Sequence, residues 1–231
     1  MESSNEETIA LFIDLVSRDA ADINLPAAAL AIARLEYPNL RIDEYLEQLA
    51  SMGDQAGRRV AAADPGEEIT ALNEFVFGDL GFSGNRDSYY DPRNSFLNEV
   101  LERRLGIPIT LSLVYLEIAA GCGLTMEGVG FPGHFIVREV SGGDLIDPFN
   151  GGIVLDQSDC ARLLAAQGVA RAESVAQYVR NVSRRQMLVR MLNNLVRYYR
   201  DVSDEGRLEP FEQMLRALDE SDAHGPPPMV Q

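Results

Sequence analysis

Apolar residues in the first third of the chain recur at intervals of three and four, the spacing that places them on one face of a helix. Pro26 suits the first turn of a helix, where a missing backbone N–H costs nothing, and Pro38 marks the end of the same segment. Four helices are predicted, over residues 9–16, 26–37, from 42 through the fifties, and 72–80. A polar, turn-rich loop follows at 81–94, with the sequence GFSGNRDSYYDPRN.

The pattern changes after this loop. Residues 95–105 predict a short helix, and residues 109–120, ITLSLVYLEIAA, predict a second one that is nearly all apolar. A helix that is apolar on most sides is usually buried. Three strand-like segments separated by Gly and Pro come next, at 126–131, 134–140 and 144–146. A buried helix followed by a small antiparallel sheet predicts an α+β fold.

The C-terminal part is helical again. Apolar stripes at 188–199 and 208–218, joined by a polar turn at 203–206, predict a helical hairpin that resembles a single tetratricopeptide-like unit. One such unit cannot form a solenoid alone, so we expect it to dock on the core. The last residues, HGPPPMVQ, are predicted to be disordered. The predicted division is a helical N-terminal region, a core, the hairpin and a tail, at residues 1–80, 81–170, 171–222 and 223–231.

The composition is that of a globular protein. The 231 residues are 46% hydrophobic and 24% charged, which allows one domain with a substantial core and a smaller appendage. No apolar run is long enough to cross a bilayer, and the acidic, polar start does not resemble a secretory signal. Two cysteines do not make a disulfide framework, so we expect free thiols and a cytoplasmic location.

The charge narrows the function classes further. A net charge of −16 argues against binding to nucleic acid or to an acidic membrane, because both partners are anionic. The sequence contains no Lys, which excludes a P-loop lysine and a Schiff base. Residues 180–200 contain six Arg and no acid, whereas residues 1–80 are strongly acidic. The two regions are candidates for packing together, for a partner site or for a solvated helix face.

One histidine stands in a pattern that suggests chemistry. His224 lies in the tail, whereas His134 opens a predicted strand in FPGHFIVRE, and Asp147 ends the next strand in LIDPFNGG. Adjacent antiparallel strands bring two such positions side by side, and an Asp beside an imidazole fixes its tautomer. The pair is either catalytic, or a structural His bonded to a turn-forming Asp.

Three blocks, in this order, carry a family resemblance: YYDPRNSFLNEVLERRLGIPITLSLVYLEIA, GLTMEGVGFPGHFIVRE and LIDPFNGG. They resemble the SirB-type branch of the transglutaminase-like superfamily, over about residues 72–155. The resemblance implies a transglutaminase-like, papain-like core with a Cys-His-Asp triad, in which His134 and Asp147 match the family His and Asp. The family Cys, about four turns before the Gly that closes the central helix, corresponds to Pro108 and is therefore missing.

Two hydroxyls near the start of the central helix are candidate replacements for the thiol. Thr110 and Ser112 need an activating base to act as nucleophiles, and His134 is the candidate base. Alternatively, each hydroxyl satisfies local backbone groups, which is common near helix starts.

The two thiols fit the nucleophile position less well. Cys122 lies at the C-terminal end of the helix, where the helix dipole disfavours a thiolate. Cys160 follows the strand that ends at Asp147, near the start of a further helix.

The sequence predicts no cofactor and no metal site, because the cluster of His or Cys that metal ligation needs is missing. A polar group before the central helix is a candidate binding surface beside His134, or else a set of helix caps. Its members are Arg93, Asn94, Asn98 and Glu99.

These observations predict a non-catalytic transglutaminase-like protein that binds a protein or peptide partner as a scaffold or regulator. A regulatory surface on the Arg-rich helix or on the acidic N-terminal half is a related possibility. The alternative is an amide or ester hydrolase, or an acyltransferase, that uses Thr110 or Ser112 with His134 and Asp147. The sequence leaves the oligomeric state open.

Overall fold

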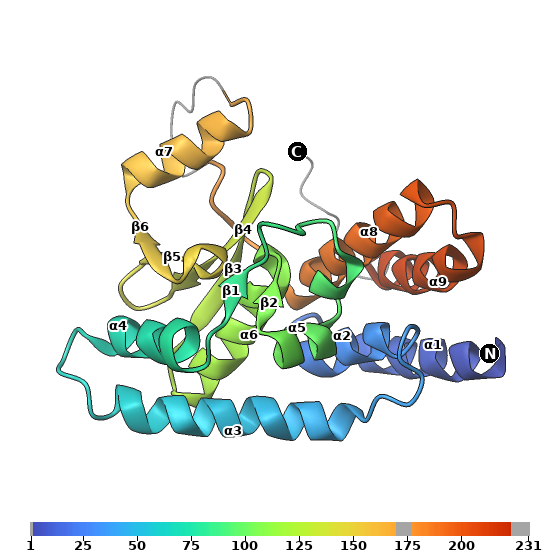
Figure 1. Cartoon of the computed structure of the whole chain (residues 1–231), viewed down its shortest axis with the longest axis horizontal. Coiled ribbons are helices and arrows are strands. Elements are labelled where there is room, and N and C mark those ends of the chain that lie inside the picture. The colour runs from blue at the N-terminus through green and yellow to red at the C-terminus, as the bar shows by residue number, and fades with distance from the viewer. Residues whose placement is uncertain (1, 170–176, 223–231) are drawn as a thin grey trace.

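The computed structural model describes residues 2–169 and 177–222, which form an α+β fold with helices around one small sheet (Figure 1). The predicted α+β class is confirmed. The sheet has the order β6-β5-β4-β3-β7, and every neighbouring pair is antiparallel. Its strands are β3 (Met126–Phe131), β4 (His134–Glu139), β5 (Leu145–Asp147), β6 (Ile153–Leu155) and β7 (Arg180–Asn181).

Helix α6 (Pro108–Gly121) is the centre of the core, as its apolar sequence predicts. One side packs on β3 and β4, and the other packs on the long helix α3 (Ile42–Val60), as Figure 1 shows. The α3–α6 crossing depends on two glycines, because a Cβ built on Gly121 would lie 2.5 Å from the Gly53 Cα. The sheet, α6 and α3 are therefore three successive layers.

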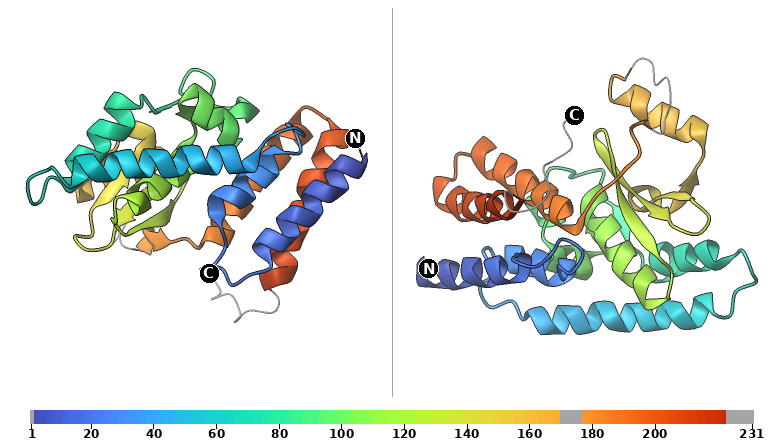
Figure 2. Two further views of the ribbon diagram at one scale, coloured as in Figure 1. Left: turned by 90° about the horizontal axis from the view of Figure 1, so that it is seen from below. Right: turned by 180° about the vertical axis from the view of Figure 1, so that it is seen from behind.

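The first and last helices of the described chain pack together and extend the core that surrounds α6. Helices α1 (Glu2–Val16) and α2 (Leu25–Ala33) lie against the hairpin of α8 (Arg184–Asp201) and α9 (Glu205–Asp222), as the two views of Figure 2 show. The Arg-rich helix does contact the acidic N-terminal region. Its guanidinium groups bond backbone oxygens there, since Arg184 donates to Ile23 and Arg185 to Val16, each over 2.8 Å.

The far face of the sheet carries a smaller core under helix α7 (Gln157–Ala166). Its buried members are Val129, Phe131, Ile136, Leu155, Cys160 and Leu164. The sheet is therefore covered on both faces, by α6 on one and by α7 on the other.

Several short elements complete the chain, and one of them, α5 (Leu97–Arg103), is the short helix predicted at 95–105. The predicted helix at 72–80 is instead α4 (Glu68–Asn73), continued as a π-helix, η1 (Glu74–Asp79). A two-residue parallel pair, β1 (Ser83–Gly84) and β2 (Leu105–Gly106), closes the loop before α6. The remaining elements are η2 (Pro92–Asn94) and η3 (Pro148–Asn150).

The predicted tail at 223–231, including His224, lies outside the described residues. Among the described helices, none combines the length and the apolar character that a membrane span requires.

Candidate functional site

His134 and Asp147 lie together at one end of the sheet. The β4–β5 register pairs Val137 with Ile146, so continuing it by one residue puts Asp147 opposite Ile136. His134 is two residues further along β4, and side chains two apart share a face of a strand. The His134 Nε2 and the Asp147 Oδ2 are 2.8 Å apart.

The turn after β5 explains why an Asp stands at this position. Asp147 is fully buried and caps η3, because its Oδ1 accepts the backbone N–H groups of Phe149 and Asn150 at 3.1 and 3.2 Å. The Asn150 side chain donates to Oδ2 at 2.6 Å. Gly151 and Gly152 have φ of 75° and 76°, a backbone conformation that favours glycine. In the sequence DPFNGG, the Asp is the N-cap, PFN forms the 3-10 turn, and the two Gly residues adopt the left-handed conformation that ends it.

These bonds assign the protons of the imidazole. A buried carboxylate that accepts three N–H donors is best satisfied by a fourth donor, so Nε2 carries a hydrogen toward Asp147. In neutral His134 this leaves Nδ1 as the acceptor nitrogen. Among the described residues, Nδ1 has no hydrogen-bond partner, and His134 lines an open cleft.

The cleft beside His134 has a volume of about 900 Å³. Six segments enclose it: the loop before α5, the start of α6, the β3–β4 turn, η3, the end of α7, and α8 from its middle to its C-terminal end. Its lining residues are Tyr89, Tyr90, Asp91, Pro92, Ser95, Ile107, Pro108, Ile109, Gly133, His134, Phe135, Phe149, Gln167, Arg190, Asn194, Arg197, Tyr198, Asp201 and Val202. A cleft of this size holds a ligand of drug-like dimensions or a short peptide.

Pro108 lines the same cleft as His134 and is the first residue of α6. A thiol at this position would gain from the positive end of the helix dipole. Proline is well suited to the first helical turn, and it offers no nucleophilic atom.

The two candidate hydroxyls do not line the cleft. Thr110 is fully buried, with its Oγ1 2.8 Å from the backbone oxygen of Asn94 and 3.2 Å from the Ile107 nitrogen, so it caps the start of α6. Ser112 is also fully buried, and its Oγ lies 3.5 Å from the Phe135 oxygen. The structure thus joins His134 to Asp147, whereas both hydroxyls bond backbone oxygens instead of His134.

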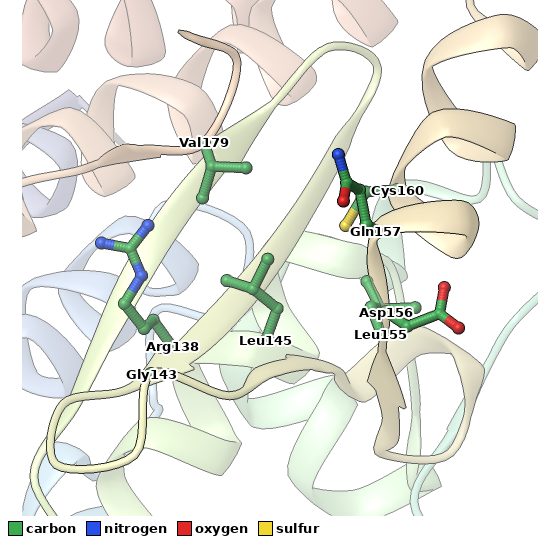
Figure 3. A pocket seen from close by; sticks show the side chains of 8 residues that line it. All are labelled: Arg138, Gly143, Leu145, Leu155, Asp156, Gln157, Cys160 and Val179. Carbon is green, nitrogen blue, oxygen red and sulfur yellow. The ribbon is translucent and has the colours of Figure 1, made fainter. Parts of the chain in front are cut away.

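The two thiols are also away from the cleft. Burial raises the pKa of Cys122, at the end of α6, to about 11. Cys160 lines a second cavity of about 330 Å³ on the far face of the sheet, where side chains from β4, β5, β6 and α7 meet (Figure 3). Its pKa is raised, first by burial and then by the charge of Asp159. Neither environment favours a thiolate.

None of the four residues of the predicted polar group lines the cleft. Asn94 is fully buried and organises the preceding loop, because its side-chain amide donates to Ser88 at 2.7 Å and its oxygen accepts from Asn85. Arg93 is exposed and pairs with Asp91 over 2.7 Å. Asn98 is nearly buried on α5, and the half-buried Glu99 lies 3.9 Å from Arg103. A binding role for the four residues stays a prediction.

Across residues 2–169 and 177–222, no three His, Cys, Asp or Glu side chains are grouped to hold a metal ion. Sequence reasoning missed the aromatic and cationic lining of the cleft. The Arg-rich character of 180–200 was visible, but nothing in the pattern singled out Arg190, and the adjacent tyrosines of the loop carried no periodic signal.

The chain matches the family described as Transglutaminase-like superfamily over residues 43–193. It is 39% identical over 203 residues to the UPF0162 protein of Xylella fastidiosa strain Temecula1, and this match covers 83% of this chain and 70% of that relative. It is also 30% identical over 226 residues to human F-box only protein 21, covering 92% of this chain and 34% of that protein. No solved structure matches the chain.

Proposed function

This chain belongs to the transglutaminase-like superfamily, and from this premise we propose that it is a non-catalytic member that binds a protein or peptide segment in the cleft beside His134. Within the superfamily we assign it to the SirB-type branch, on the three sequence blocks given above. We also retain as proposals the domain division, the tetratricopeptide-like nature of the α8–α9 hairpin and a cytoplasmic location.

One observation carries the non-catalytic proposal: the first position of α6, where the family thiol would stand, is Pro108, and it opens onto the same cleft as His134. The neighbouring hydroxyls of Thr110 and Ser112 are buried and point to backbone oxygens. A base and its orienting carboxylate without an attacking atom cannot perform acyl transfer by the family route.

The lining of the cleft supports a binding role. Aromatic side chains with a polar end suit recognition surfaces, because one part packs and the other bonds water or partner. Tyr90, whose side chain is 81% exposed, lines the cleft together with Phe149 and Tyr198. The similarity to human F-box only protein 21 also supports a role in protein interactions.

The alternative, a hydrolase or acyltransferase, is favoured by the intact His134–Asp147 pair. In that scheme the Thr110 or Ser112 oxygen attacks an amide or ester carbonyl while His134 takes its proton and returns it to the leaving group; water then hydrolyses the acyl ester. It requires a hydroxyl to leave its present backbone partner and reach His134.

Covalent labelling separates the two functions. The wild-type chain is incubated with a fluorophosphonate and with a panel of activated esters, and adducts are located by mass spectrometry. We expect none at Thr110 or Ser112. A Pro108→Cys variant is the positive control for geometry: its thiolate should displace iodide from iodoacetamide faster than Cys122 or Cys160 does.

The second half of this test uses His134. Adding His134→Ala to Pro108→Cys should slow the alkylation several-fold, because the neighbouring imidazole no longer supports the thiolate. Acylation of Thr110 or Ser112 in the wild type that disappears in His134→Ala would overturn the non-catalytic proposal. An unreactive Pro108→Cys thiol in a folded variant would remove the geometric basis for placing the family nucleophile there.

A further inference from the structure

Two aspartates and two arginines line the cleft, and three of these four side chains already have an ionic partner. Asp91 is already paired with Arg93 at 2.7 Å, and Asp201 lies 4.0 Å from Arg197. Arg190 has no acidic side chain within 4.0 Å among residues 2–169 and 177–222. The cleft therefore presents one cation that the described part of the chain leaves without a counter-ion.

Arg190 is held in place beside His134. Its Nη2 donates to the His134 backbone oxygen over 3.2 Å, and its Cζ lies 5.3 Å from the centre of the Phe135 ring. Burial lowers the pKa of Arg190, which reports the cost of keeping this charge partly out of water. The bond to His134 uses one of the five N–H donors of the guanidinium, so others remain for a ligand.

We propose that Arg190 receives a carboxylate of the peptide segment that lies in the cleft, beside His134. This inference rests on the proposed peptide-binding function and specifies its ligand chemistry. A guanidinium and a carboxylate form two parallel hydrogen bonds, which fix the orientation of the bound segment as well as its position. The carboxylate comes either from a chain terminus or from an Asp or Glu side chain.

A single carboxylate fits the cleft better than a polyanion. One unpaired cation neutralises one charge, and the chain as a whole carries −16, which repels nucleic acids and polyphosphates. The aromatic side chains of the lining, Tyr90 and Phe149 among them, give the rest of a peptide an apolar surface on which to pack.

The test uses the full chain and three bead libraries of random hexapeptides. The first has free C-terminal carboxylates and contains no Asp or Glu. The second has C-terminal amides and no Asp or Glu. The third has C-terminal amides and one Glu. We expect the first or the third library to bind and the second to bind at least about tenfold more weakly, because it cannot pair with Arg190.

Two variants link the result to this side chain. Arg190→Gln should lose at least about tenfold in affinity for the acid-bearing peptides and little for neutral ones. Arg200→Gln is the matched control, since Arg200 lies on the same helix, does not line the cleft and already faces Glu212 over 2.8 Å, and its loss should change affinity by less than about threefold. If Arg190→Gln fails to fold, Arg190→Lys keeps the charge without the fork and should bind the same peptides several-fold more weakly.

The outcomes distinguish the two proposals. Binding of the first library alone identifies a chain terminus, and binding of the third alone identifies an acidic side chain; either supports the inference. Equal binding of all three libraries with no effect of Arg190→Gln overturns the inference and leaves peptide binding standing. No binding of any library overturns peptide binding in the cleft and the inference with it.

Discussion

Replacing Asp147 with Ala tests whether the His134–Asp147 pair is part of the structural framework. The buried carboxylate accepts four hydrogen bonds, from the backbone of Phe149 and Asn150, from the Asn150 side chain and from His134. Ala removes every acceptor at once. The turn that positions β6 and the orientation of the imidazole should both loosen.

The size of the effect follows from these contacts. Loss of a capping side chain costs about 1 kcal/mol. The loss of each charge-assisted hydrogen bond from a side-chain donor adds about 1 kcal/mol or somewhat more to this cost. The bond from His134 adds less, because this side chain is partly exposed and water can replace the lost acceptor. We expect a loss of about 3 kcal/mol in the free energy of unfolding. For a chain of this length, that corresponds to a fall in Tm of roughly 6–12 °C.

Urea unfolding followed by far-UV circular dichroism measures the change. Asp144→Ala is the matched control, because Asp144 is exposed just before β5, and it should stay within about 0.5 kcal/mol of the wild type. Asp147→Asn should fall in between, since an amide keeps one acceptor oxygen. If Asp147→Ala lowers the free energy of unfolding by less than about 1 kcal/mol, the carboxylate does not stabilise the turn. The His134–Asp147 pair would then have no structural role that explains its presence.

Two further predictions concern α6. Gly121→Ala should destabilise the fold by about 1–3 kcal/mol, because its Cβ would meet the Gly53 backbone; Gly78→Ala, with nothing within 4 Å of the added carbon, should be close to neutral in the same urea titration. Burial raises the pKa of the Glu117 carboxyl group above its ordinary 4.5, so the folded chain holds the carboxyl proton more tightly than the unfolded chain does. The folded state therefore loses stability as the pH rises through the pKa that Glu117 has in the folded chain. Glu117→Gln should therefore be more stable than the wild type at neutral pH, by a margin that shrinks as the pH falls toward 4.5; a margin independent of pH would contradict the assignment.

The elements that periodicity could predict were those with a continuous apolar face. The buried helix at 109–120 and the three strand segments match α6, β3, β4 and β5 within one or two residues. The pairing of His134 with Asp147 followed from the strand order, because the register of two adjacent strands is a local property.

The elements that were missed depend on distant partners. Strand β7 is two residues long and exists only because Arg180 and Asn181 meet β3 across about fifty residues of chain. The same holds for Arg190, which enters the cleft through the packing of α8 on the rest of the fold and not through any local pattern. Local sequence carries no signal for such contacts.

The packing of α1 against α9 has a consequence for the order in which this chain acquires its structure during synthesis. The fully buried Phe12 belongs to the same core as the equally buried Phe211. A ribosome adding roughly 5–20 residues per second makes α1 wait about 10–40 s for α9 to appear. During that interval α2 can already pack on α1 but α9 cannot, so part of the apolar face of α1 stays exposed and prone to aggregation.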